Sequence, residues 1–245
     1  MNKKVKKLLK KVGHICFNLF IIFQIYLSIR IYWLVSCIIP TNSMFPTLVS
    51  GDYIFVSVQI PGRRIWEEDI AHPGHYLIHR KKGVRKIEKM DIVVFNFPYG
   101  DDNKKMIMSD RTFYCKRCTA IPGETYQWRT NEKWKSMYLP KIGDIIQIDS
   151  INYGDYHRCI EYETKAPIRI DKMGQVYLAD TLLNSYCFQH DYYFVCGDNI
   201  NDSYDSRYWG LLPDDFILGV GQIIWFSKDQ KTKQVRWNRI LKKTL

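Results

Sequence analysis

An uncharged, apolar run close to the N-terminus constrains the fold of this chain more than any other feature. Residues 12–29 read VGHICFNLFIIFQIYLSI and contain no Asp, Glu, Lys or Arg. As an α-helix this run is about 27 Å long at about 1.5 Å per residue, which is close to the thickness of a bilayer core. Arg30, Tyr32 and Trp33 follow it, where a snorkelling cation and aromatic side chains meet the membrane interface. The run therefore predicts one transmembrane helix over residues 12–30.

The charges before this helix predict its orientation. Residues 1–11 contain six Lys and no acidic residue, and short segments with such a basic excess stay in the cytoplasm. We therefore expect the N-terminus in the cytoplasm and everything after residue 30 on the opposite side of the membrane. In this arrangement the chain is a single-pass membrane protein with one extracytoplasmic domain.

Three other interpretations compete with a retained transmembrane helix. A cleaved secretory signal requires a small-x-small site, and residues 27–40 contain no convincing one. The sequence LVSC at residues 34–37 resembles a bacterial lipobox, which would make Cys37 a lipidation site, although Arg30 interrupts the apolar run directly before it. The third interpretation is a buried core helix, against which the adjoining block of lysines argues.

The net charge of +11 is concentrated at the two ends of the chain. Besides the lysines of residues 1–11, residues 228–245 hold seven basic residues and one Asp, which leaves residues 12–227 close to neutral. We expect no nucleic-acid partner, because a nucleic-acid groove needs a basic face on the folded domain. Basic ends suit contact with a lipid membrane instead.

Runs of aromatic and β-branched residues predict a mostly β soluble part. Residues 61–89 are polar and rich in Lys and Arg, so we expect a loop there, and residues 124–190 have the pattern of an inserted β region. Residues 234–245 carry four cations among apolar side chains and predict a short amphipathic helix for contact with anionic lipid. The predicted strands cover residues 31–39, 52–56, 90–95, 111–121, 191–196 and 216–227.

Several well-known site motifs are absent from the sequence. No G-x-S-x-G or S-x-x-K motif surrounds Ser43, and no H-E-x-x-H motif is present. His72, His75 and His79 have a spacing that metal ligands can have, but a Pro-Gly pair between the first two prevents a shared helix. We interpret these three histidines as solvated loop residues.

A C-x-x-C motif lies within the predicted strand 111–121. The alternation of a strand places Tyr114, Lys116 and Cys118 on one face and Cys115 and Arg117 on the other, so the two thiols point apart. A second C-x-x-C that could complete a zinc site is missing. With seven cysteines at irregular spacing, no disulfide framework is predicted.

Four segments of the sequence resemble, in order, motifs of the bacterial type I signal peptidases (leader peptidases), which are membrane-bound serine proteases with a Ser–Lys dyad. One such motif alone is moderate evidence, whereas four in the family's order and spacing are highly specific. The predicted topology also matches. The segments are residues 40–48 (PTNSMFPTL), 90–95 (MDIVVF), 114–117 (YCKR) with 121–124 (IPGE), and 197–210 (GDNINDSYDSRYWG).

The resemblance implies a catalytic role for three residues. Ser43 would be the nucleophile and Lys116 its general base. The oxyanion of the tetrahedral intermediate would be bound by the main-chain N–H of Ser43 and by the hydroxyl of Thr41, where the family often has Ser. Lys116 can act as a base only when neutral, so its reference pKa of about 10.4 must fall by a few units through burial.

The resemblance also implies supporting residues. Ser203 would help to orient the lysine, and Asp205 with Arg207 would form an ion pair that shapes the site. Taken alone, the acidic residues of this loop could be Ca²⁺ ligands, but the loop lacks EF-hand spacing. Ile39 and Cys115 would line the substrate pocket.

The sequence departs from the family pattern at three places. Ile200 stands where the family usually has Arg, and Asn201-Asp202 follows it in place of the commoner Asp-Asn. Cys115 stands where the family usually has an aliphatic residue. These changes keep the dyad but affect the packing of the loop and the shape of the pocket.

Together, pattern and resemblance predict a mostly β fold. A coiled antiparallel β-sheet forms the catalytic core, which carries an inserted β subdomain and is preceded by one N-terminal transmembrane helix. The predicted parts are a basic cytoplasmic N-terminus (1–11), the transmembrane helix (12–30), the catalytic core (31–123 and 191–245) and the inserted subdomain (124–190).

The implied function is removal of signal peptides from exported preproteins by a monomeric enzyme of the bacterial cytoplasmic (inner) membrane. Cleavage would follow small residues at positions −3 and −1. No metal or other cofactor is implied, because the dyad supplies both nucleophile and proton transfer. Two alternatives stay open: a self-cleaving Ser–Lys regulator, and a non-catalytic membrane-tethered binding module descended from a peptidase.

Overall fold

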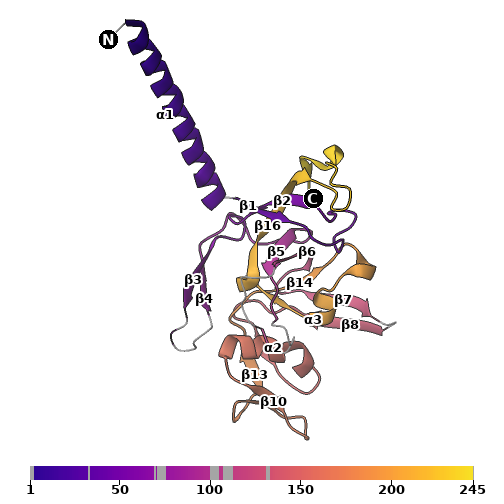
Figure 1. The fold of residues 1–245 in the computed structure, drawn as a ribbon. Coiled ribbons are helices and arrows are strands. Elements are labelled where there is room, and N and C mark those ends of the chain that lie inside the picture. The colour runs from indigo at the N-terminus through magenta and orange to yellow at the C-terminus, as the bar shows by residue number, and fades with distance from the viewer. Residues whose placement is uncertain are drawn as a thin grey trace.

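The computed structural model describes residues 3–32, 34–68, 70, 76–99, 105, 106, 113–130 and 133–244. Helix α1 (Lys3–Tyr32) projects away from a mostly β body (Figure 1). Its segment Lys10–Ser28 is apolar and long enough to cross a membrane, and none of this segment is buried against the body. The predicted apolar helix at the N-terminus is therefore confirmed.

The helix continues beyond the predicted boundary and shortens the strand that follows. Strand β1 spans Leu34–Ile38, whereas the sequence predicted a strand over residues 31–39. The prediction was wrong for Ile31 and Tyr32, which belong to α1. Once a helix is nucleated, each added residue gains a hydrogen bond without a new nucleation cost, so the helix passes the end of the apolar run.

One antiparallel sheet forms the body. Its strand order is β1-β2-β16-β5-β6-β14-β15, and β17 pairs with β16. The mostly β fold is confirmed, and the predicted strands from residue 52 onward agree with the structure to within a few residues. The strands after β1 are β2 (Asp52–Ser57), β5 (Ile92–Asn96), β6 (Phe113–Ala120), β14 (Tyr192–Cys196), β15 (Leu212–Pro213), β16 (Ile217–Ser227) and β17 (Lys242–Lys243).

Strand β5 is buried on both faces and separates two hydrophobic clusters. Ile92 and Val94 belong to the smaller cluster, and Val93 and Phe95 belong to the larger one. Successive side chains of a strand point to opposite faces, so a continuous apolar run such as IVVF suits a strand with a core on each side. This rigid centre positions the neighbouring strand β6.

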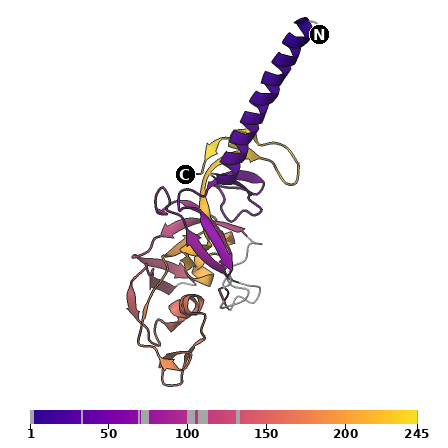
Figure 2. The same ribbon diagram turned by 90° about the vertical axis from the view of Figure 1, so that its left-hand side faces the viewer.

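The inserted region contains a helix that the sequence analysis missed. Helix α2 spans Tyr153–Thr164, and its buried residues include Tyr156, Cys159 and Ile160 at helical spacing. Frequent aromatic residues among polar ones favoured strands in the sequence. In Figures 1 and 2, α2 and the orange part of this region lie at the end of the body opposite α1. Its strands are β7 (Thr125–Thr130), β8 (Lys133–Tyr138), β9 (Ile145–Gln147), β10 (Ile168–Ile170), β11 (Val176–Leu178), β12 (Thr181–Leu182) and β13 (Ser185–Cys187).

The loop predicted for residues 61–89 is wrong in part. β3 (Arg64–Glu68) and β4 (Tyr76–Arg80) form an antiparallel hairpin. The guanidinium of Arg64 donates to the main-chain oxygen of Asp215 at 2.8 Å, and that of Arg80 to the main-chain oxygen of Ile217 at 2.7 Å. The basic residues that suggested a solvated loop thus anchor the hairpin to the body.

The amphipathic helix predicted for the tail is also wrong. Residues Trp237–Arg239 form one 3₁₀ turn, and β17 then pairs with Ile223 and Ile224 of β16. Pairing is possible there because β5 contacts only an earlier part of β16. The open edge of β16 therefore determines the structure of the tail.

Candidate active site

The loop that carries Ser43 is closed by hydrogen bonds near its two ends. Ile39 donates to the main-chain oxygen of Asp52, and Gly51 donates to that of Ile39, each at 2.8 Å. Gly51 has a φ of +91°, and a Cβ atom there would lie 2.0 Å from the main-chain oxygen of Lys228. Only glycine fits this turn. Met44 and Leu48 are buried beneath the loop and fix it to the smaller hydrophobic cluster.

Ser43 and Lys116 are in direct contact. The Nζ atom of Lys116 lies 2.6 Å from the Oγ atom of Ser43. Lys116 is only 3% exposed, and β6 alternates as predicted, with Lys116 and Cys118 buried and Cys115 and Arg117 less so. The strand thus holds the amino group of a lysine inside the protein and against a serine hydroxyl.

The surroundings of Lys116 favour its neutral form. Burial lowers the pKa of Lys116, because removing the ammonium from water costs more than removing the amine. Nearby acidic groups, Asp205 among them, act in the opposite direction but do not cancel the effect of burial. The arrangement meets the requirement for a lysine general base.

A cavity of about 390 Å³ opens beside this pair. Ile39, Thr41 and Cys115 line it together with Ser43 and Lys116. The Oγ1 atom of Thr41 lies 3.4 Å from the Oγ atom of Ser43. The structure therefore brings the predicted nucleophile, base, oxyanion donor and pocket residues around one cavity.

The segment after β14 packs against the back of the Ser43 loop. The main-chain N–H of Asn199 donates to the oxygen of Ser43 at 3.0 Å. A Cβ atom on Gly197 would lie 2.2 Å from the Oγ atom of Ser203 and 2.5 Å from the main-chain oxygen of Ser43. Close approach of the two segments thus requires glycine at residue 197.

Asp205 is fully buried and organises this segment. Its carboxylate accepts hydrogen bonds from Ser203 Oγ at 2.7 Å and from the main-chain N–H of Gly197 at 2.9 Å, and it forms a bidentate pair with Arg207. Burial by itself raises the pKa of Asp205, but these hydrogen bonds outweigh it and lower the pKa. The predicted ion pair is present. Ser203 was expected to orient Lys116. Both residues are described by the structure, and no hydrogen bond joins them; the Ser203 hydroxyl donates to Asp205.

Two ion pairs around the site were not anticipated. Arg117 forms a bidentate pair with Asp198 at 2.6 Å, and Arg239 pairs with the fully buried Asp52 at 2.6 Å. The only signal for the first was the position of Arg117 directly after Lys116. The second joins residues far apart in the sequence, and nothing in the local pattern marks it.

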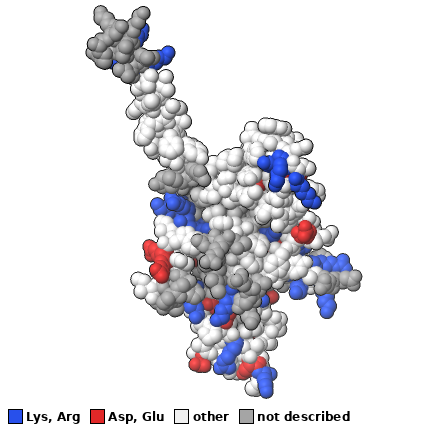
Figure 3. Space-filling view, viewed as in Figure 1, with Lys and Arg blue, Asp and Glu red and all other residues white. Residues whose placement is uncertain are grey.

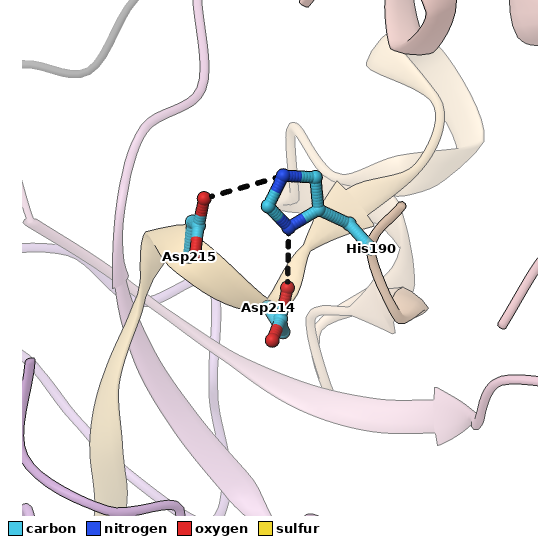
Figure 4. Close-up of side chains that lie close together, drawn as sticks. All are labelled: His190, Asp214 and Asp215. Atoms are coloured by element: carbon cyan, nitrogen blue, oxygen red, sulfur yellow. Dashed lines mark hydrogen bonds and ion pairs between the residues drawn. The ribbon is translucent and has the colours of Figure 1, made fainter. Parts of the chain in front are cut away.

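One cluster has the composition of a metal site but lies away from Ser43. His190 contacts Asp214 through Nδ1 at 3.1 Å and Asp215 through Nε2 at 3.5 Å (Figure 4). Burial lowers the pKa of His190, but the two carboxylates raise it overall. A protonated His190, hydrogen-bonded to Asp214 and ion-paired with Asp215, gives both carboxylates a partner without a metal ion. His79 is exposed and lies on β4 rather than in a loop, while His72 and His75 lie outside the described residues.

Comparison with known proteins gives a consistent match. Residues 12–226 match the profile of the family described as signal peptidase, peptidase S26. A signal peptidase I of Buchnera aphidicola (from Acyrthosiphon pisum) is 30% identical over 246 residues, which cover 82% of this chain and 72% of the relative. A signal peptidase I of Rickettsia prowazekii is 30% identical over 224 residues, covering 87% and 78%. One of Aquifex aeolicus is 26% identical over 227 residues, covering 86% and 82%.

Proposed function

Because this chain belongs to the signal peptidase family, peptidase S26, we propose that it cleaves signal peptides from exported preproteins with Ser43 as nucleophile and Lys116 as general base. The observation that carries the proposal is the 2.6 Å contact between Lys116 Nζ and Ser43 Oγ, made by a lysine that is 3% exposed. Serine with a neutral lysine is a chemically complete pair for acyl transfer.

The reaction follows from this pair. Neutral Lys116 accepts the hydroxyl proton of Ser43 while Oγ attacks the carbonyl carbon of the scissile bond. The C–N bond then breaks, and the Lys116 ammonium returns the proton to the leaving amine. In the second half, Lys116 deprotonates a water molecule that attacks the acyl-enzyme ester, which releases the signal peptide and restores Ser43.

Thr41 and the main chain are proposed to stabilise the oxyanion. The Thr41 hydroxyl lies 3.4 Å from Ser43 Oγ, beside the position of the reacting carbonyl. The second donor is the main-chain N–H of Ser43. Donors fixed before the reaction lower the barrier because they need no reorganisation as the charge develops.

The pocket supports binding of an extended peptide with small side chains. β1 is the terminal strand of the sheet order and lines the cavity together with β6. An extended peptide can add to such an edge through main-chain hydrogen bonds. Ile39 and Cys115 are proposed to limit the space for side chains at positions −3 and −1.

The position of the site suits a membrane-embedded substrate. α1 ends at Tyr32 and β1 begins at Leu34, so the cavity beside β1 lies close to the end of the membrane helix. We propose an N-in orientation in the bacterial cytoplasmic membrane, with the body on the outer face. External protease added to spheroplasts should then digest the body and spare the N-terminal segment, whereas protection of the whole chain would contradict this orientation.

For membrane binding by the tail, we propose a smaller contribution than four free cations would give. Arg239 pairs with buried Asp52, and Arg236 pairs with Asp229 at 2.8 Å. These two cations thus bind the body itself. Lys242 and Lys243 are the exposed cations of β17.

Cleavage of a preprotein by the purified full-length protein in detergent tests the proposed function. We expect conversion to the mature form by the wild-type protein and none by Ser43→Ala. A non-catalytic binding module would instead leave the preprotein intact with both proteins, and equal cleavage by both would place the activity elsewhere.

A further inference from the structure

A second groove lies beside the catalytic loop and strand β6. The pocket beside the dyad is lined by residues up to Met44 in the catalytic loop and up to Lys116 in β6. The second groove, of about 940 Å³, is lined by Pro46 in the same loop and by Arg117 in β6. In the catalytic loop and in β6, residues that line the pocket are thus followed within two positions by residues that line the groove. Because β6 alternates, Arg117 points to the face opposite to Lys116, so the groove lies behind the catalytic loop.

The second groove is strongly basic. Among the described residues, it is lined by five basic side chains and a single acidic one. Figure 3 shows two separate groups of Lys and Arg on this side of the body, one near the C-terminal segment and one near the β7–β8 hairpin. The basic residues are Arg117, Arg129, Arg207, Lys242 and Lys243, and the acidic one is Asp198.

Two of the five cations are engaged within the protein. Arg117 pairs with Asp198, and Arg207 pairs with Asp205. The side chains of Arg129, Lys242 and Lys243 are exposed, and none forms an ion pair with another described residue. Three cations from two separate elements thus face the groove with their charge available for a ligand.

We propose that this groove binds the first residues of the mature part of the preprotein and selects acidic side chains there, an inference that rests on the proposed function. The residues before the scissile bond occupy the pocket of Ile39 and Cys115, so the chain after the bond continues past Ser43 into the groove. Opposite charge favours acidic residues at these positions, and like charge disfavours lysine and arginine. An extended peptide advances about 3.3 Å per residue, so the contacts fall a few residues after the cleavage point.

Continuity with the dyad favours a peptide over a lipid headgroup as the occupant. Gly197 lines this groove, and a Cβ atom there would lie 2.5 Å from the main-chain oxygen of the nucleophile. A ligand in the groove therefore lies against the back of the catalytic loop. In the proposed path, the part of the substrate after the scissile bond passes this point.

Two peptides that share one signal sequence and cleavage point test the proposal. One carries Glu and the other Lys at the third to fifth positions after the scissile bond. For the full-length wild-type protein in a non-ionic detergent at low salt, we expect kcat/KM to favour the Glu peptide about tenfold, equivalent to about 1.4 kcal/mol. Added salt should reduce this ratio, because the groove is open to solvent.

A triple variant and a matched control locate the effect. Arg129→Gln with Lys242→Gln and Lys243→Gln should reduce the Glu-to-Lys ratio to below about twofold. The control carries three changes of exposed cations elsewhere and should keep the wild-type ratio. Its changes are Lys141→Gln, Lys172→Gln and Lys231→Gln.

Binding to the Ser43→Ala protein separates this proposal from the proposed function. Its affinities for the two peptides, measured by fluorescence anisotropy, should show the same preference without cleavage. Equal affinities, or a ratio that the triple variant leaves unchanged, would overturn the groove assignment even if preproteins are cleaved. If the triple variant lost only its binding to vesicles that contain anionic lipid, the groove would be a lipid site instead.

Discussion

The side chains of Lys116 and Ser43 meet at 2.6 Å although 72 residues separate them in the sequence. One lies on the rigid strand β6, and the other lies on a loop held by buried Met44 and Leu48. This contact depends on the packing of the central sheet, which keeps the lysine away from water.

Removal of the lysine amine should abolish activity while leaving the fold intact. We expect Lys116→Met and Lys116→Arg to lose at least about 10³-fold in kcat, because Met cannot accept a proton and Arg does not become neutral. Lys141→Met, at an exposed position, is the control and should keep full activity. More than a few per cent of activity in Lys116→Arg would remove Lys116 from the role of base.

The substitution Lys116→Met should also stabilise the folded protein. Because the pKa of Lys116 is lower in the folded than in the unfolded state, protonation favours the unfolded state, and the cost to stability is fully present below the folded-state pKa. The free energy of unfolding of Lys116→Met should exceed that of the wild type at neutral pH, and this excess should shrink as pH rises towards about 10.4, the unfolded-state value. Urea unfolding of the wild type and of Lys116→Met at several pH values measures this difference in the free energy of unfolding and its change with pH. A Met variant less stable than the wild type at neutral pH would contradict a costly buried ammonium.

Thr41 tests the oxyanion assignment with two substitutions. Thr41→Ser keeps the hydroxyl, whereas Thr41→Val keeps the shape and removes the donor. We expect Thr41→Val to lower kcat by about 10²- to 10³-fold and Thr41→Ser to remain close to the wild type. Equal rates for the two variants would reduce Thr41 to a packing residue.

Gly197 tests how tightly the second segment fixes the nucleophile. Gly197→Ala places a methyl group 2.2 Å from Ser203 Oγ and 2.5 Å from the main-chain oxygen of Ser43, so the loop must move. A displacement near 1 Å can cost about 10²-fold in rate, and we expect such a loss in kcat. Gly154→Ala is the matched control, because nothing lies within 4 Å of its Cβ position and alanine is favoured in helix α2. A fully active Gly197→Ala would show that this close contact is dispensable.

The ion pair beneath the site should dominate local stability. Arg207→Met leaves the fully buried carboxylate of Asp205 without its bidentate partner, and breaking such a pair typically costs about 3–5 kcal/mol. Arg169→Met, which removes an exposed and long-range pair with Asp180, should change the free energy of unfolding by less than about 0.5 kcal/mol. Similar losses for the two variants would contradict the buried pair as a structural support.

The contribution of the Asp205–Arg207 pair to stability should be lost at low pH. The pKa of Asp205 is lower in the folded state than in the unfolded state, so its contribution is present above about pH 4, the unfolded value, and is lost as pH falls through the folded value. The stability of the wild type should therefore fall more steeply below about pH 4 than that of Asp205→Asn.

The sequence was informative where a signal is local. The alternation around Lys116 predicted its buried face, and the uncharged run at residues 12–29 predicted the apolar helix. Contacts between residues far apart in the sequence were not predictable. Strand β17 pairs with the part of β16 whose edge remains open in the folded sheet. Arg239, just before β17, pairs with Asp52, which lies far away in the sequence. The hairpin β3–β4 was missed for a related reason, since its arginines, buried Arg64 and half-buried Arg80, bind main-chain oxygens that only the folded body provides.

The pH dependence of preprotein cleavage by the full-length protein tests the Lys116 base most directly. With Ser43→Ala as the blank, kcat/KM measured from about pH 6 to about pH 9 should rise with pH, because protonated Lys116 cannot accept the serine proton and burial lowers its pKa. A flat profile across this range would contradict the assignment of Lys116 as the base that activates Ser43.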